Sequence, residues 1–115
     1  MNIYELMERA AANDASDLHI TVGLPPIIRV SAGLIPLCDQ IVTSEMSEQF
    51  ARDIMKDDHW DSFLAAGEVD FSISVPGKYR YRVNAFRQRQ SVALAMRLIK
   101  FNPPDINTLG LPPVV

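Results

Sequence analysis

The stretch from Phe71 to Lys100 constrains the fold more than any other part of the chain, because apolar and polar residues alternate along it. Three strands are predicted here, over residues 71–75, 79–86 and 91–99. We expect turns between them at Pro76-Gly77-Lys78 and at Arg87-Gln88-Arg89-Gln90. Successive side chains of a strand point to opposite faces of its sheet, so each possible register predicts which residues lie together. The pattern indicates an antiparallel β-meander.

In one register the paired side chains that share one face of the meander are all apolar. Its first hairpin pairs Val75 with Tyr79, Ile73 with Tyr81, Phe71 with Val83 and Val69 with Ala85. Its second hairpin, centred between Gln88 and Arg89, pairs Tyr79 with Leu98, Tyr81 with Met96, Val83 with Leu94 and Ala85 with Val92. The opposite face then carries Asp70, Ser72, Ser74, Arg80, Arg82, Asn84, Ala93, Ala95 and Arg97. We therefore predict one buried face and one face that bears arginines.

The arginine-bearing face is strongly basic, although the whole chain has a net charge of −3. Residues 71–104 hold seven of the eleven basic residues and contain no Asp or Glu. In the predicted register Arg80 lies opposite Arg97, and like charges in such positions destabilise a sheet. Guanidinium groups bind phosphate and carboxylate well, so an anionic partner is one interpretation. The other is that these arginines pair with acids of the same domain or lie in water, where charged residues also discourage aggregation.

The remaining sequence predicts helices around a mainly antiparallel sheet. A helix over residues 2–12 begins with a capping box formed by Asn2 and Glu5. Thr43 is the predicted N-cap of a second helix. Asp57 or Asp58 is the predicted N-cap of a third, which buries Trp60, Phe63 and Leu64 and ends at Gly67. Further strands are predicted over residues 18–22, 27–30 and 34–37, the last at a sheet edge because of Pro36. The fold class is α+β.

Several functional classes find no support in the chain. There is no P-loop motif and no dinucleotide-binding glycine motif. His19 and His59 have no second ligand at the spacing that a metal site needs, so no metal site is predicted. The lone Cys38 excludes an internal disulfide. On composition and spacing alone, the sequence indicates an α+β domain with an arginine-lined sheet face.

Five motifs occur in one order along the chain. They are Ala-Ser-Asp-Leu-His at residues 15–19, Gly-Leu-Pro-Pro-Ile-Ile-Arg-Val at 23–30, Asp-Phe-Ser at 70–72, Arg-Tyr-Arg-Val-Asn-Ala-Phe at 80–86 and Leu-Gly-Leu-Pro at 109–112. Together they resemble the N-terminal domain of the PilT family of type IV pilus retraction (twitching-motility) ATPases, in the type II/IV secretion ATPase superfamily. The resemblance covers essentially the whole chain. It implies a PAS-like domain over residues 1–104 and, over residues 105–115, the start of a linker to a RecA-like ATPase domain that the sequence does not contain.

The resemblance also implies a function for the basic face. In this family six subunits form a ring, and nucleotide binds between the two domains of the protein. Arg82 and Arg97 match the family's arginines that approach the phosphates as arginine-finger candidates, and Arg80 would join them in nucleotide binding. The isolated domain is expected to hold no cofactor and no metal and to have no enzymatic activity, whereas the full-length protein would be an ATPase that uses ATP and Mg²⁺.

The implied partners are the protein's own ATPase domain, neighbouring subunits of a homohexamer and the pilus platform protein of the inner membrane. The implied location is the cytoplasm, peripheral to that membrane. An alternative is a free-standing PAS-like module that binds a small ligand or a protein. A nucleic-acid binder that uses the basic meander is a third hypothesis and predicts salt-dependent binding. The chain's overall acidity argues against it, so no nucleic-acid partner is expected.

Overall fold

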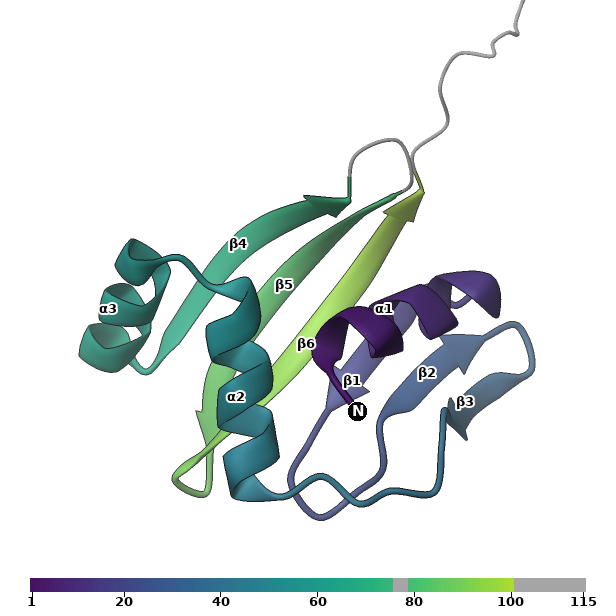
Figure 1. Ribbon diagram of the computed structural model, residues 1–115, viewed down its shortest axis with the longest axis horizontal. Coiled ribbons are helices and arrows are strands. Elements are labelled where there is room, and N and C mark those ends of the chain that lie inside the picture. Colours follow the sequence, from purple (N-terminus) through teal and green to yellow (C-terminus); the bar gives the residue numbers. More distant parts are fainter. Residues whose placement is uncertain (76–78, 101–115) are drawn as a thin grey trace, which may run out of the picture.

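The computed structural model describes residues 1–75 and 79–100, in which three helices lie against a six-stranded sheet (Figure 1). In chain order the elements are α1 (Ile3–Ala12), β1 (Asp17–Ile20), β2 (Ile27–Val30), β3 (Gly33–Pro36), α2 (Ser44–Ile54), α3 (Asp57–Ala66), β4 (Glu68–Val75), β5 (Tyr79–Gln88) and β6 (Ser91–Lys100). The strand order is β3-β2-β1-β6-β5-β4, and every neighbouring pair is antiparallel. The predicted α+β class is confirmed.

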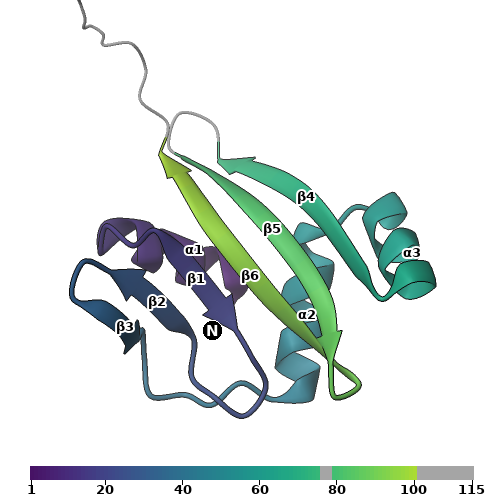
Figure 2. The ribbon, with the colours of Figure 1, turned by 180° about the vertical axis from the view of Figure 1, so that it is seen from behind.

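The helices lie on one side of the sheet, which we call the covered face, and leave the other side, the open face, without a helical layer (Figures 1 and 2). The covered face of β5 and β6 is apolar and buried; its residues are Tyr81, Val83, Ala85, Val92, Leu94 and Met96. Buried side chains of α1 and α2, including Leu6 and Phe50, belong to the same core. The burial of apolar area in this layer is the main source of stability.

The first hairpin of the meander has the predicted register. Val75 pairs with Tyr79, Phe71 with Val83 and Val69 with Ala85. Strand β4 begins at Glu68, three residues before the predicted start at Phe71. The predicted turn at residues 76–78 lies outside the described residues.

The predicted register of the second hairpin is wrong by two residues. The loop consists of Arg89 and Gln90 alone, because Gln88 pairs with Ser91. Both loop residues have positive φ, 53° and 67°, as a two-residue type I′ turn requires. Arg82 therefore lies opposite Arg97, where the sequence placed Arg80. A displacement of two residues keeps each side chain on its face, so the predicted division into two faces is confirmed.

Two of the three predicted helix caps are confirmed. The Asn2 side chain accepts from the Glu5 N–H at 2.9 Å while the Glu5 carboxylate accepts from the Asn2 N–H at 3.2 Å, and Thr43 Oγ1 accepts from the Met46 N–H. The third is wrong: α3 is capped at Lys56, whose N–H donates to His59 Nδ1 at 3.2 Å. Both candidate aspartates instead lie in the first turn, where the helix dipole favours negative charge.

The apolar side of α3 is narrower than predicted. Phe63 is buried and Trp60 packs against the core, but Leu64 is 52% exposed, so its predicted burial is wrong. Gly67 ends the helix in the predicted left-handed conformation, with φ 82°.

The N-terminal strands extend the meander into one sheet. β1 pairs with β2 and also with β6, so the chain returns to the centre of the sheet with its last described strand. β1 ends at Ile20, two residues before the predicted end, and β3 forms the sheet edge as predicted. Of the helices in the described ranges, none combines the length and apolar character needed to cross a bilayer.

Candidate functional site

A row of charged side chains crosses four neighbouring strands on the open face. Arg82 of β5 lies opposite Arg97 of β6, Arg97 lies opposite Asp17 of β1, and Asp17 lies opposite Arg29 of β2. Because residues directly opposite in a sheet share a face, these four side chains form one line across it. We call this line the arginine row, and its net charge is +2.

Asp17 forms ion pairs with the arginines on both of its sides. Its Oδ1 lies 3.5 Å from Arg97 Nε, and its Oδ2 lies 3.5 Å from Arg29 Nε. Ser16 Oγ donates to the same Oδ2 at 2.7 Å. The Asp17 side chain is only 14% exposed, whereas Arg97 and Arg29 are 75% and 55% exposed. The carboxylate thus lies beneath two guanidinium groups that reach into solvent.

Arg82 has no such partner among the residues that the structure describes. It lies beside Arg97 at a hollow of about 360 Å³, which we call the open-face hollow. The hollow is lined by Asp17, His19, Asp70, Arg82, Asn84, Ala95, Met96 and Arg97. Ala95 lies directly between Asn84 and His19, and its small side chain leaves space between the larger ones.

A second carboxylate at the open-face hollow, that of Asp70, is hydrogen-bonded to another residue that lines the hollow. Asn84 Nδ2 donates to Asp70 Oδ1 at 3.0 Å. Asp70 keeps its negative charge in this charge-assisted hydrogen bond. Arg82 is left at the wall of the hollow as a cation with no ion-pair partner among the described residues. Such a group is suited to an oxyanion supplied from outside the domain.

The third predicted site residue lies apart from the other two. Arg80 pairs with Ile99 on β6, is exposed, and does not line the open-face hollow. The structure thus brings Arg82 and Arg97 together and leaves Arg80 two residues away along β5.

Two members of the arginine row were not singled out by sequence reasoning. Asp17 and Arg29 both lie within motifs that carry the family resemblance; Arg29 lies between the apolar Ile28 and Val30, and Asp17 between Ser16 and Leu18. The contact of Asp17 with Arg97 depends on the pairing of β1 with β6, which joins residues 80 positions apart. The contact of Arg29 with Asp17 depends on the pairing of β1 with β2. Alternation shows that they share a face with other polar residues of their own strand, but not which distant strand they meet.

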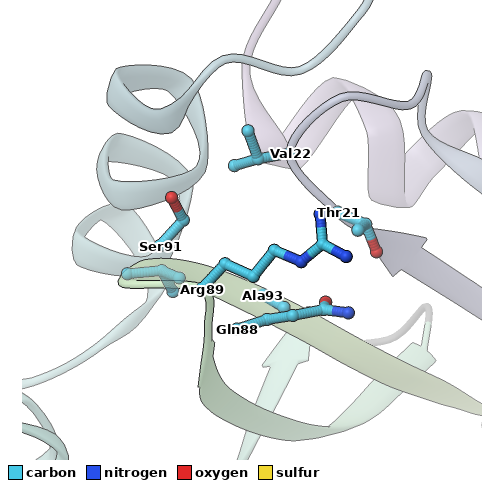
Figure 3. A pocket seen from close by; sticks show the side chains of 7 residues that line it. Thr21, Val22, Gln88, Arg89, Ser91 and Ala93 are labelled. Atoms are coloured by element: carbon cyan, nitrogen blue, oxygen red, sulfur yellow. The ribbon is translucent and has the colours of Figure 1, made fainter.

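A second hollow lies at the tip of the β5–β6 hairpin, beside the residues that follow β1. It measures about 350 Å³ and is lined by Thr21, Val22, Gln88, Arg89, Ser91, Val92 and Ala93. In Figure 3 the Arg89 side chain extends across it toward Thr21, with Gln88 alongside. Arg89 is the one charged side chain among these seven lining residues, so the hollow carries a positive charge at the hairpin tip.

Within the described ranges, no group of three or more His, Cys, Asp or Glu side chains could hold a metal ion. The guanidinium groups of the open face are suited to binding anions, and His19 and Asn84 are neighbouring polar groups.

The fold and this surface define an α+β domain with one packed face and one arginine-rich face. Three comparisons with known proteins place it further. The chain is 36% identical over 111 residues to the type IV pilus retraction ATPase PilT of Pseudomonas aeruginosa, covering 96% of the chain and 32% of that protein. It is 30% identical over its whole length to the type IV pilus ATPase PilU of the same organism and covers 30% of it.

A solved structure is also similar to this chain. The crystal structure of the pilus retraction motor PilT with bound ADP superposes with a TM-score of 0.83 at 34% identity, covering 97% of this chain and 33% of that one. No protein-family model matches the chain. The chain is therefore similar in sequence and in fold to a part of PilT and in sequence to a part of PilU, and it spans about a third of the length of the relatives it matches.

Proposed function

We propose that this domain serves a hexameric type IV pilus retraction ATPase, in which its arginines contact nucleotide held by an adjoining RecA-like domain. Arg82 and Arg97 would approach the γ-phosphate, and Arg80 would add positive charge further along β5. The observation that carries the proposal is the placement of Arg82 and Arg97 side by side at the open-face hollow. The homology to PilT, a protein solved with bound ADP, supports nucleotide as the anion.

The physical role of the two arginines would be charge neutralisation. Negative charge on the phosphoryl oxygens is stabilised by guanidinium groups that are already in position, as with an arginine finger. Two guanidinium groups in directly opposed positions repel one another, and an oxyanion between them would remove that repulsion. Bound nucleotide would therefore reduce the electrostatic repulsion on the open face of the domain.

The remaining parts of the machinery are assigned to the ATPase domain. The chain contains no P-loop motif, so the phosphate-cradling loop and the Mg²⁺ ligands would come from the adjoining domain. The domain alone would hydrolyse no ATP. Its other partners would be neighbouring subunits of the ring and the pilus platform protein, which would place it in the cytoplasm at the inner membrane.

The test is ATP turnover by the full-length protein. Arg82→Ala and Arg97→Ala are each expected to lower turnover by at least ~100-fold, because each removes a donor to the transferring phosphoryl group. The matched control is Arg52→Ala, which removes an arginine that stacks over Trp60 on α3, away from the open face. Unchanged turnover in the Arg82 and Arg97 variants would refute the assignment. It would favour the alternative of a ligand- or protein-binding module.

A further inference from the structure

In the ion pairs with Asp17, each arginine contacts the carboxylate through one nitrogen of its guanidinium group. Both contacts are made by Nε, the nitrogen nearest the side-chain stem. A guanidinium group carries its other donors on the two terminal nitrogens. Since Arg29 and Arg97 have exposed side chains and no further partner among the described residues, their terminal nitrogens remain available.

Asp17 itself is fixed more firmly than its partners. It lies in the central strand pairing, with β2 on one side and β6 on the other, and its Oδ2 accepts from Ser16 Oγ. Its side chain is mostly buried, while the two arginines are mostly exposed. A fixed carboxylate between two long, flexible cations restricts the directions in which those cations can point.

We propose that Arg29 is a further phosphate-binding residue of the open face and that Asp17 is a positioning residue that holds Arg29 and Arg97 as a pair. The proposal rests on the proposed function, because it takes the ligand to be the triphosphate that Arg82 and Arg97 contact. The anion would be held by the terminal nitrogens of three arginines, with Asp17 beneath two of them. Arg29 thus joins the site from β2, a strand on the opposite side of β1 from β6.

Asp17 could either offset positive charge or position the two arginines, and these two roles predict opposite changes in anion affinity when its charge is removed. If the carboxylate merely offsets positive charge, Asp17→Asn would raise affinity for an anion, because the row becomes more positive. If Asp17 positions the arginines, Asp17→Asn would lower the affinity, because both side chains lose their anchor and become mobile. The sign of the change in affinity therefore separates the two roles.

The experiment measures ATP affinity and steady-state kinetics of the full-length protein. Arg29→Gln is expected to raise the Kd and KM for ATP about tenfold, as the loss of one charge-assisted hydrogen bond would. Asp17→Asn is expected to weaken ATP binding by a similar factor, and Asp17→Glu, which keeps the charge, to restore part of it. Arg52→Gln, with the same change in charge as Arg29→Gln, is the control and should leave both constants unchanged.

The outcomes distinguish this inference from the proposed function. If Arg82→Ala and Arg97→Ala reduce turnover while Arg29→Gln leaves ATP affinity unchanged, the role of Arg29 is wrong and the proposed function stands. If Asp17→Asn tightens binding, its positioning role is wrong. If none of these variants changes turnover or affinity, both proposals fail. Thermal unfolding of each variant separates lost binding from lost folding, and Asp17→Glu supplies the answer if Asp17→Asn does not fold.

Discussion

The two faces of one sheet differ in almost every physical respect, although the same strands form both. On β6, Met96 is 1% exposed beneath the helices, while the next residue, Arg97, has a side chain that is 75% exposed. The covered face is apolar, whereas the open face places guanidinium groups next to each other. The difference shows that side chains alternating along the same strands can form a packed core on one face of the sheet and a charged surface on the other. The packed face stabilises the fold, so the other face can tolerate charges that repel.

The largest effect is expected on the covered face. Met96→Ala removes buried side-chain atoms and leaves a cavity, and should lower the free energy of unfolding by about 2–5 kcal/mol. The matched variant is Arg97→Ala, one residue away on the open face, which should change it by less than about 1 kcal/mol because exposed ion pairs contribute little. Urea denaturation followed by circular dichroism measures both. Equal losses would contradict the division of roles between the faces.

A smaller effect is expected at the one tyrosine buried in the covered face. Tyr81 Oη donates to the Met7 carbonyl oxygen at 2.8 Å and ties α1 to β5. Tyr81→Phe leaves that carbonyl without its partner and should cost about 1–3 kcal/mol. The measurement is again the free energy of unfolding, compared with Tyr4→Phe, whose hydroxyl donates to the Asp53 carbonyl oxygen at 2.9 Å. Because Tyr4 is 51% exposed and water can replace that hydrogen bond, Tyr4→Phe should cost less than Tyr81→Phe.

The same tyrosine makes stability depend on alkaline pH. Burial, and secondarily the neighbouring Tyr79, raises the pKa of Tyr81 far above its usual value. The unfolded chain loses this proton near pH ~10 while the folded chain keeps it, so stability is lost as pH rises above about 10. Tyr81→Phe should make this decline shallower. Identical pH profiles for the two proteins would show that Tyr81 does not contribute.

The smallest effect is expected at the tip of the β5–β6 hairpin. Gln90 has φ 67°, a conformation that glycine adopts without a steric penalty. Gln90→Gly should therefore raise the free energy of unfolding by up to about 1 kcal/mol. Ser91→Gly, one residue further along in extended β6, should lower it by roughly 0.5–1 kcal/mol. A loss of stability in Gln90→Gly would show that the turn is not strained.

The two hairpins show how far the sequence alone could predict this fold. In both, alternation identified the covered face, because a buried face needs apolar residues at every second position. Alternation could not fix the second register, since a displacement of two residues leaves the faces unchanged. The usual signal for a two-residue turn is Asn-Gly or Asp-Gly, and Arg89-Gln90 carries neither. The prediction therefore placed Arg80, rather than Arg82, opposite Arg97.

The candidate site was predictable in part for the same reason. Arg82 and Arg97 were expected on one basic face, and the structure places both at the open-face hollow. The ion pairs of Asp17 were not foreseen, because its contact with Arg97 depends on the long-range pairing of β1 with β6. No local pattern in β1 or β6 specifies that pairing. Motif resemblance marked residues 15–19 and 23–30 as important without indicating what they contact.

The most direct test of the account is a structure of the full-length protein with a non-hydrolysable ATP analogue and Mg²⁺. The measured quantity is the distance from the guanidinium nitrogens of Arg82 and Arg97 to the nearest γ-phosphate oxygen. We expect hydrogen-bonding distances of about 3 Å for both arginines in at least one subunit of the ring. If the open face lies against solvent or protein and both arginines stay beyond the reach of the nucleotide in every subunit, the central claim is contradicted.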